Sequence, residues 1–424
     1  MDAEALTLIT LTFFAWGLFA TRLGRADLSA PIVFVTLGLL LSEGLDLIHP
    51  DVSHETVKVL AEVTLVWVLF ADAARVRLPE LRADLGLYAR LLGFGLPLTI
   101  AAGALLALGM FDGMGVWLAL LIGAALAPTD AALGAAVMTD PAVPGRIRRL
   151  LNVESGLNDG IATPVVTVAI AGVAAAESLD GQPSVGASVL DLAIGLAVGI
   201  IVGWVGGVAM RTARHRGWAS EEFAGPGVLA LALAAYTLAL WVDGNGFVAA
   251  FIGGLTFGNF AGRGGTKEVY YVEQTAGLAS LLTWLIFGAV AVPIVFERAD
   301  VQVVVYAVLS LTAVRMLPVA LALIGTGLSR QTVAFIGWFG PRGLASIIFA
   351  LIALEDLHTG VDQAVAVIGM TVLLSVFAHG LTAKPLANRF GTSSADPTVG
   401  PEDTEAPQPP VRGLLHRHSK SATG

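Results

Sequence analysis

One ten-residue stretch, LNVESGLNDG, gathers the side chains best suited to binding a hard cation. It holds the carboxylates of Glu154 and Asp159, the hydroxyl of Ser155 and the amide of Asn158. At about 100° per residue, a helix places Ser155, Asn158 and Asp159 on one arc of about 100°. By the same geometry Glu154 points about 140° away from Asp159. Oxygen ligands without His or Cys suit Na⁺ better than a transition metal, so the trio is a candidate cation site.

The surroundings of this stretch are those of a membrane span. The residues that follow it, IATPVVTVAIAGVAAA, carry no charge. The chain of 424 residues is 56% hydrophobic and 13% charged, whereas a soluble domain carries about 25% charge. A helix needs about 20 apolar residues to cross a bilayer core of roughly 30 Å. Successive apolar runs leave almost no polar surface, which excludes a soluble fold.

We predict an all-α polytopic membrane protein with about thirteen transmembrane helices, from apolar runs of this length. The first run lacks a basic n-region and a cleavage site, so it is not expected to be a cleaved signal peptide. The runs lie at residues 3–20, 30–48, 57–78, 84–108, 114–138, 148–175, 186–210, 223–242, 245–262, 268–296, 300–326, 330–354 and 361–386.

Basic residues are sorted by side, which predicts the orientation. Taken alternately, one set of loops contains only Lys58 and Arg298, and the other contains fourteen basic residues. Because basic residues mark the cytoplasmic side, the N-terminus is expected outside and the C-terminus inside, as an odd number of spans requires. The basic set comprises Arg22, Arg25, Arg75, Arg77, Arg82, Arg146, Arg148, Arg149, Arg211, Arg214, Arg216, Arg263, Lys267 and Arg330.

The rest of the chain adds no recognisable second domain. Residues 1–390 form the predicted transmembrane domain, and residues 391–424 are rich in Pro, Ser, Thr and charge, which predicts a disordered cytoplasmic tail. The chain contains no Cys, so disulfides and thiolate metal sites are excluded. No cofactor and no nucleic-acid partner are expected.

Three ionisable residues lie far from the ends of the spans, and Glu154 lies in the same run as one of them. Asp130 falls about 16 residues into the fifth run, and Asp159 and Arg342 fall about 11 and 12 residues into the sixth and twelfth, roughly 17 Å deep at 1.5 Å per residue. Each buried charge costs on the order of 3 kcal/mol, and the four together on the order of 10 kcal/mol if unpaired. A purely structural salt-bridge cluster is the alternative to a site. We expect Glu154 to pair with Arg342, which would hold the sixth and twelfth spans together.

Two predicted spans are interrupted at membrane depth. The fifth carries Pro128 before Asp130, and the twelfth carries Gly340, Pro341 and Arg342. Proline removes a helical hydrogen bond, and unwound backbone inside a membrane is tolerated where it lines a cavity or is buried in protein. The breaks are seven spans apart, as expected for inverted repeats, and paired broken helices indicate a secondary transporter.

At these residues the sequence resembles the monovalent cation:proton antiporters. The motifs are PTD in the fifth span, ESGLNDG in the sixth and GWFGPRGLAS in the twelfth, and the resemblance covers about residues 5–390. The Asn-Asp pair is similar to the NhaP and sodium/proton-exchanger branch, where the electrogenic branch carries Asp-Asp. One departure is Ala131, which stands where the family pattern often has proline.

The resemblance implies roles for individual residues. Asp159 corresponds to the essential carboxylate that carries the cation or the proton, with Asn158 beside it. Ser155 and Thr129 correspond to cation ligands, Thr129 through its backbone carbonyl. Further implied assignments place Asp130 at the crossing of the unwound chains, Glu154 and Arg342 in the pair that ties the two halves together, and Asp72 in the cation site. For Asp72 the alternative is an interfacial carboxylate beside Arg75 and Arg77.

The expected function is therefore secondary transport and not enzymatic catalysis. The first hypothesis is a Na⁺/H⁺ antiporter, also accepting Li⁺, that works by alternating access with electroneutral 1:1 exchange. Alternatives are a K⁺/H⁺ antiporter on the same site, or a cation channel or sodium-coupled solute carrier on the same scaffold. The resemblance also implies the NhaA-like antiporter fold, a homodimer and a bacterial-type plasma membrane location.

Three further patterns carry weaker predictions. Gly195, Gly199, Gly203 and Gly207 recur every four residues, which indicates close helix packing. Glu273 and Arg315 are candidates for an ion pair, unless each reaches interfacial water. The histidines, His379 among them, are expected in loops, at span ends or in the tail.

Overall fold

The computed structural model describes residues 3–25, 29–45, 54–176, 185–262, 265–357 and 361–393. Over these ranges the chain is helical and contains no strand. The first half comprises α1 (Ala3–Arg25), α2 (Ala30–Leu39), α3 (His54–Arg75), α4 (Leu78–Leu81), α5 (Leu85–Arg90), α6 (Leu96–Met110), α7 (Val116–Ala125), α8 (Ala135–Met138) and α9 (Gly145–Ala176). The second half comprises α10 (Val185–His215), α11 (Glu221–Trp241), α12 (Gly246–Phe260), α13 (Gly265–Ile286), α14 (Val292–Glu297), α15 (Val301–Leu311), α16 (Ala313–Ala322), α17 (Arg330–Trp338), α18 (Leu344–Asp356) and α19 (Val361–Ser393).

The predicted polytopic all-α class is confirmed. Eight of the described helical stretches are long and apolar enough to cross a membrane, and three shorter apolar helices accompany them at Ala30–Gly44, Val116–Ala125 and Gly246–Phe260. Every predicted apolar run contains helix. Several runs combine two helices: a π-helical turn at Leu91–Gly95 joins α5 to α6, and another at Phe287–Ala291 joins α13 to α14. The number of spans and their orientation stay predictions.

Both predicted interruptions are present, and they cross each other. α7 ends at Ala125 and α8 begins at Ala135, while α17 ends at Trp338 and α18 begins at Leu344. The backbone N–H of Asp130 in the first break donates to the carbonyl of Pro341 in the second, at 2.7 Å. The break forms although Ala131 replaces the family's proline, because Pro128 already lies within the unwound segment.

The glycine stripe of α10 packs against α12, as predicted. Side chains added at Gly195, Gly199 and Gly203 would collide with the carbonyl oxygens of Asn245, Ala249 and Gly253. The missing side chains let the two helix backbones approach closely.

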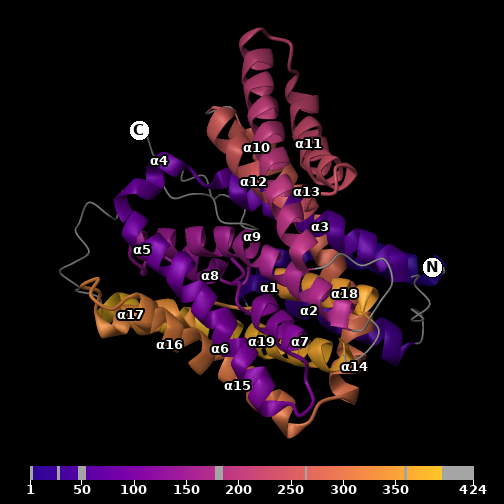
Figure 1. Ribbon diagram of the computed structural model, residues 1–424, viewed down its shortest axis with the longest axis vertical. Helices are drawn as coiled ribbons and strands as arrows, with labels where there is room; N and C mark the ends of the chain where they lie inside the picture. The colour runs from indigo at the N-terminus through magenta and orange to yellow at the C-terminus, as the bar shows by residue number, and fades with distance from the viewer. Residues whose placement is uncertain are drawn as a thin grey trace.

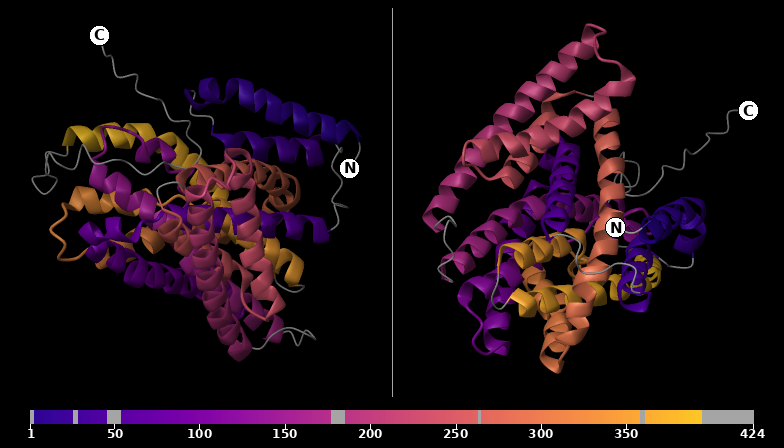
Figure 2. Two further views of the ribbon diagram at one scale, coloured as in Figure 1. Left: turned by 90° about the horizontal axis from the view of Figure 1, so that it is seen from above. Right: turned by 90° about the vertical axis from the view of Figure 1, so that its right-hand side faces the viewer.

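α10 and α11 run side by side at the top of Figure 1 and again in the right-hand view of Figure 2.

The end of the last helix differs slightly from the predicted domain boundary. α19 continues to Ser393 and so includes the first three residues of the predicted tail. The remainder of the predicted tail, residues 394–424, lies outside the described residues.

Candidate cation site at the helix crossing

Thr129, in the first break, joins the two polar residues of α9 that were predicted to share a face. Its Oγ1 lies 2.8 Å from Ser155 Oγ and accepts a hydrogen bond from Asn158 Nδ2 at 2.7 Å. All three residues are at most 3% exposed. The spacing of Ser155 and Asn158 placed them on one face of α9, where both contact Thr129, and their use as a cation site stays a prediction.

These hydrogen bonds leave other oxygens available to a ligand. Asn158 donates through Nδ2, and its buried Oδ1 has no hydrogen-bond partner in the part of the chain that the structure describes. The backbone carbonyl of Thr129, which lies in an unwound segment, accepts no hydrogen bond from the described residues. Two oxygens of the type that alkali cations prefer thus lie at the crossing.

Asp159 supplies the carboxylate next to these oxygens along α9. It is 8% exposed and lies one helical turn beyond Ser155. Its backbone carbonyl accepts from Thr163 Oγ1 at 2.7 Å, and α9 continues through Pro164. A side chain at Gly160 would collide with Phe251 of α12, so this part of α9 is closely covered. A cation or a proton at Asp159 would be well shielded from water.

Asp130 is held by backbone amides on both sides of the crossing. Its Oδ1 accepts from the N–H of Ala132 at 2.7 Å and of Leu133 at 3.3 Å, and its Oδ2 accepts from the N–H of Leu344 at 2.9 Å. Leu344 opens α18, where the helix dipole places partial positive charge. The geometry fits the predicted place of Asp130 at the crossing, and its use as a cation ligand stays a prediction.

Arg342 donates to backbone carbonyls beyond the end of α7, whereas Asp130 accepts from backbone amides. The fully buried side chain donates through Nη1 to the carbonyls of Ala127 at 2.9 Å and Pro128 at 3.1 Å. Both carbonyls lie in the unwound segment just past the end of α7, and a positive charge is favourable near the C-terminal end of a helix. Arg342 therefore stabilises one half-helix and Asp130 the other.

The predicted ion pair between Glu154 and Arg342 is wrong. Glu154 Oε1 instead accepts from Arg315 Nη2 of α16 at 2.6 Å, and both side chains are at most 4% exposed. The helical geometry correctly turned Glu154 away from Asp159. Arg342 is unavailable because it is used by the carbonyls of the crossing, whereas Arg315 faces α9 from the adjacent α16. The pair ties α9 to α16.

Two other residues are placed differently from their sequence-based expectations. Glu273 pairs with Arg75 of α3 and not with Arg315. His379 lies inside α19 and is 2% exposed, not at a span end. In the sequence, Arg315 is a lone charge in the apolar run AVRMLP, which could have indicated a buried partner. His379 lies inside a long apolar run, which could have indicated that it is buried.

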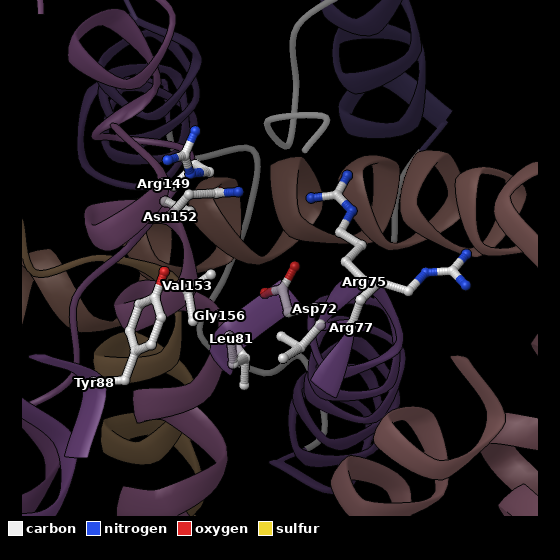
Figure 3. A pocket seen from close by; sticks show the side chains of 11 residues that line it. Asp72, Arg75, Arg77, Leu81, Tyr88, Arg149, Asn152, Val153 and Gly156 are labelled. Carbon is white, nitrogen blue, oxygen red and sulfur yellow. The ribbon is translucent and has the colours of Figure 1, made fainter. Parts of the chain in front are cut away.

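Asp72 lines a pocket between the end of α3 and the start of α9, on the predicted cytoplasmic side. Figure 3 shows its carboxylate between Arg75 on one side and Asn152 with Arg149 on the other. A side chain added at Gly156 would lie 3.9 Å from Asp72 Cβ, which places Asp72 opposite α9 one turn before Asp159. Asp72 is only 8% exposed. The position fits both the cation-site and the interfacial interpretations, and its role stays a prediction.

Comparison with known proteins agrees with the resemblance to cation:proton antiporters. The sequence profile of the family described as "Sodium/hydrogen exchanger, transmembrane" matches residues 8–389. The chain is 26% identical to the K(+)/H(+) antiporter NhaP of Alkalimonas amylolytica, over 95% of this chain and 70% of that protein. It is 24% identical to the Na(+)/H(+) antiporter ApNhaP of Aphanothece halophytica, over 83% of this chain and 69% of that protein.

The fold also matches a solved structure. The sodium proton antiporter MjNhaP1 from Methanocaldococcus jannaschii superimposes with a TM-score of 0.75 and 21% identity, over 92% of this chain and 99% of that one. The sequence relatives are longer, and this chain spans between 62% and 70% of their length.

Proposed function

We propose that this chain, which belongs to the sodium/hydrogen exchanger family, exchanges Na⁺ for H⁺ across a cell membrane through the site at Asp159. It is a multi-pass membrane protein of a cation/proton antiporter family. The observation that carries the proposal is the buried cluster of Thr129, Ser155 and Asn158 beside Asp159, at the crossing of two broken helices.

The site can carry either ion, but only one at a time. As a carboxylate, Asp159 balances the charge of a dehydrated cation, with the carbonyl of Thr129 and the amide oxygen of Asn158 as further ligands. As a carboxylic acid, it is neutral and has no charge to balance. Competition between proton and cation for one carboxylate couples their movements when the site opens alternately to the two sides. Rigid-body movement of the site-bearing helices provides this alternation.

K⁺ is the second candidate substrate. Relatives of this chain carry the name K(+)/H(+) antiporter as well as Na(+)/H(+) antiporter, and oxygen ligands accept both ions. We place Na⁺ first, with Li⁺, because Thr129, Ser155 and Asn158 are at most 3% exposed and bond directly to one another, which suits a smaller ion than K⁺. A channel or a sodium-coupled solute carrier needs an open water path or a roomier cavity.

Proton flux in reconstituted vesicles distinguishes these functions. Vesicles with an internal pH dye receive a pulse of NaCl, LiCl, KCl or choline chloride. We expect Na⁺ and Li⁺ to move protons in the opposite direction, K⁺ to be weaker and choline to have no effect. A response to K⁺ alone would select the K⁺/H⁺ antiporter. Cation movement without proton movement would contradict the antiporter proposal.

We further propose that the protein is a homodimer with one complete site per protomer. α1 presents exposed apolar side chains, among them Leu11, Phe14 and Leu18, which suit a helix–helix contact as well as lipid. The mass of the protein in lipid nanodiscs and in mild detergent is the test, and a monomer in both would contradict the proposal.

A further inference from the structure

His379 of α19 is a buried polar residue that the transport mechanism above does not use. Its Nε2 lies 2.8 Å from the carbonyl oxygen of Trp338, and its ring stacks on the Trp338 ring with centroids 5.2 Å apart. Its Nδ1 lies 3.2 Å from Ser375 Oγ and 2.9 Å from the Ser375 carbonyl, one turn earlier on the same helix. The side chain therefore connects α19 to the last residue of α17.

Ser375 holds the other side of the same break. Its Oγ accepts a hydrogen bond from the backbone N–H of Arg342 at 2.7 Å. Trp338 ends α17, and Arg342 lies just before the start of α18 at Leu344. Two side chains one turn apart on α19 thus fix the unwound segment at both of its ends.

The fixed segment is packed directly on the candidate cation site. A Cβ added at Gly340 would lie 2.9 Å from Thr129 Cγ2 and 2.6 Å from Arg315 Nε. Beyond it, the Arg342 side chain donates to the carbonyls of Ala127 and Pro128, immediately before Thr129. A displacement of the segment would therefore move the Thr129 carbonyl relative to Asn158 and Asp159.

We propose that His379, acting with Ser375, is a positioning residue of the cation site. The inference rests on the proposed function, since it concerns the same site. In the neutral Nε2–H tautomer, His379 donates to Trp338 O and accepts from Ser375 Oγ–H, while Ser375 Oγ accepts from Arg342 N–H. In the imidazolium, Nδ1–H donates to the Ser375 carbonyl and the bond to Trp338 is kept. Residues that orient the ligands of an ion typically change its affinity about 10–100-fold when they are replaced.

The test compares His379 with a neighbour that contacts the same tryptophan. Thr382 Oγ1 accepts from the Trp338 indole N–H at 3.0 Å and donates to the Ala378 carbonyl of its own helix, and among the described residues it has no hydrogen bond to the backbone of the break. Variants H379A, H379Q, S375A and the control T382V are reconstituted, and the Na⁺ concentration for half-maximal proton flux (KM) is measured separately from the maximal rate. Na⁺-dependent stabilisation in detergent, read as the shift of Tm with Na⁺ concentration, gives affinity without transport.

We expect H379A to raise KM and the Na⁺ concentration for stabilisation about tenfold. H379Q should recover most of this loss, because its amide can still donate to the Trp338 carbonyl. S375A should act in the same direction, and T382V should change KM less than twofold. If H379A does not fold, H379Q and S375A compared with T382V decide the question.

Two outcomes would overturn the proposal while leaving the proposed function intact. One is an active wild type whose Na⁺ affinity is unchanged in H379A and S375A, even if the amount of folded protein falls. The other is an equal rise of KM in T382V, which would show a structural role of the whole Trp338 neighbourhood. A wild type with neither Na⁺-driven proton flux nor Na⁺ stabilisation would instead refute the proposed function, and this inference with it.

Discussion

At the scale of single residues, Asp159 is a carboxylate in a nearly water-free setting. It is 8% exposed and lies one turn beyond Ser155 on α9. A buried carboxylate is costly unless it is hydrogen-bonded or paired with a positive charge. Replacing its charge while keeping its shape is therefore the most direct probe of the site.

The first prediction concerns Asp159→Asn. Exchange should be abolished because the amide cannot bind a proton or balance a cation, while Tm should stay equal or rise because a neutral buried group costs less than a charge. Vesicle proton flux and thermal unfolding are the measurements. Asp243→Asn is the matched control, since Asp243 is exposed and its positive φ of 55° suits Asn equally well. Near wild-type flux in Asp159→Asn would show that another group carries the ions.

The second prediction concerns Thr129→Val. The change keeps the shape but leaves the Asn158 amide N–H and the Ser155 hydroxyl without their shared partner. An unsatisfied buried group costs about 1–3 kcal/mol, and KM for Na⁺ should rise. Thr371→Val is the control: Thr371 is equally buried, but its Oγ1 bonds to the Val367 carbonyl of its own helix. Equal losses of stability in the two variants would contradict a special role for Thr129.

At the scale of helices, the third prediction concerns the pair that links α9 to α16. Glu154→Gln or Arg315→Met alone should destabilise by about 3–5 kcal/mol, because each leaves an unpaired buried charge. The double variant should lose less than the sum. The free energies of unfolding of the wild type, the two single variants and the double variant, measured in detergent, form the double-mutant cycle. A parallel cycle on Glu221 and Lys267, which are 88% and 79% exposed, should give coupling below about 1 kcal/mol. Additive losses for Glu154 and Arg315 would exclude a direct pair.

The fourth prediction tests the contact of α10 with α12. Gly203→Ala should lower Tm, because the new Cβ would collide with the Gly253 carbonyl. Gly277→Ala of α13, where nothing lies within 4 Å of the added Cβ, should leave Tm unchanged or raise it, since Ala favours a helix over Gly by about 1 kcal/mol. Comparable Tm values for the two variants would show that α10 and α12 can separate without loss.

At the scale of the whole molecule, the fifth prediction is electroneutral exchange. Asn158 cannot titrate, Glu154 is paired with Arg315, and Asp130 accepts backbone amides at both oxygens. One exchanging carboxylate then moves one proton against one Na⁺. Membrane voltage acts on net charge at about 2.3 kcal/mol per charge per 100 mV, so Na⁺-driven proton flux should not respond to an imposed potential.

The measurement uses a potential set by valinomycin and K⁺, after K⁺ has been shown not to be a substrate. A supported-membrane recording provides an independent check on net charge movement. A sustained transport current, or a rate that scales with the potential, would mean that a second carboxylate carries a proton. Asp130 would then be the first residue to replace, followed by Asp72.

Much of the molecule could be predicted from the sequence because the bilayer restricts what a chain can do. An apolar run of about 20 residues must be helical, since its backbone groups have no water to bond. Helical spacing alone also placed Ser155 and Asn158 together and turned Glu154 away from Asp159. Proline and glycine at membrane depth correctly located both breaks. These features depend on residues close together in the chain.

Only the tertiary structure decided which distant residues meet. Glu154 faces Arg315 and not Arg342, Glu273 faces Arg75, and His379 is buried against the end of α17. A charge inside a span must find a counter-charge or a helix end, but several partners satisfy that need equally well in sequence. The choice among them is set by how the helices pack and cross. Arg342 bonds to the carbonyls of Ala127 and Pro128 in the first break because both breaks meet at one point, which no local pattern specifies.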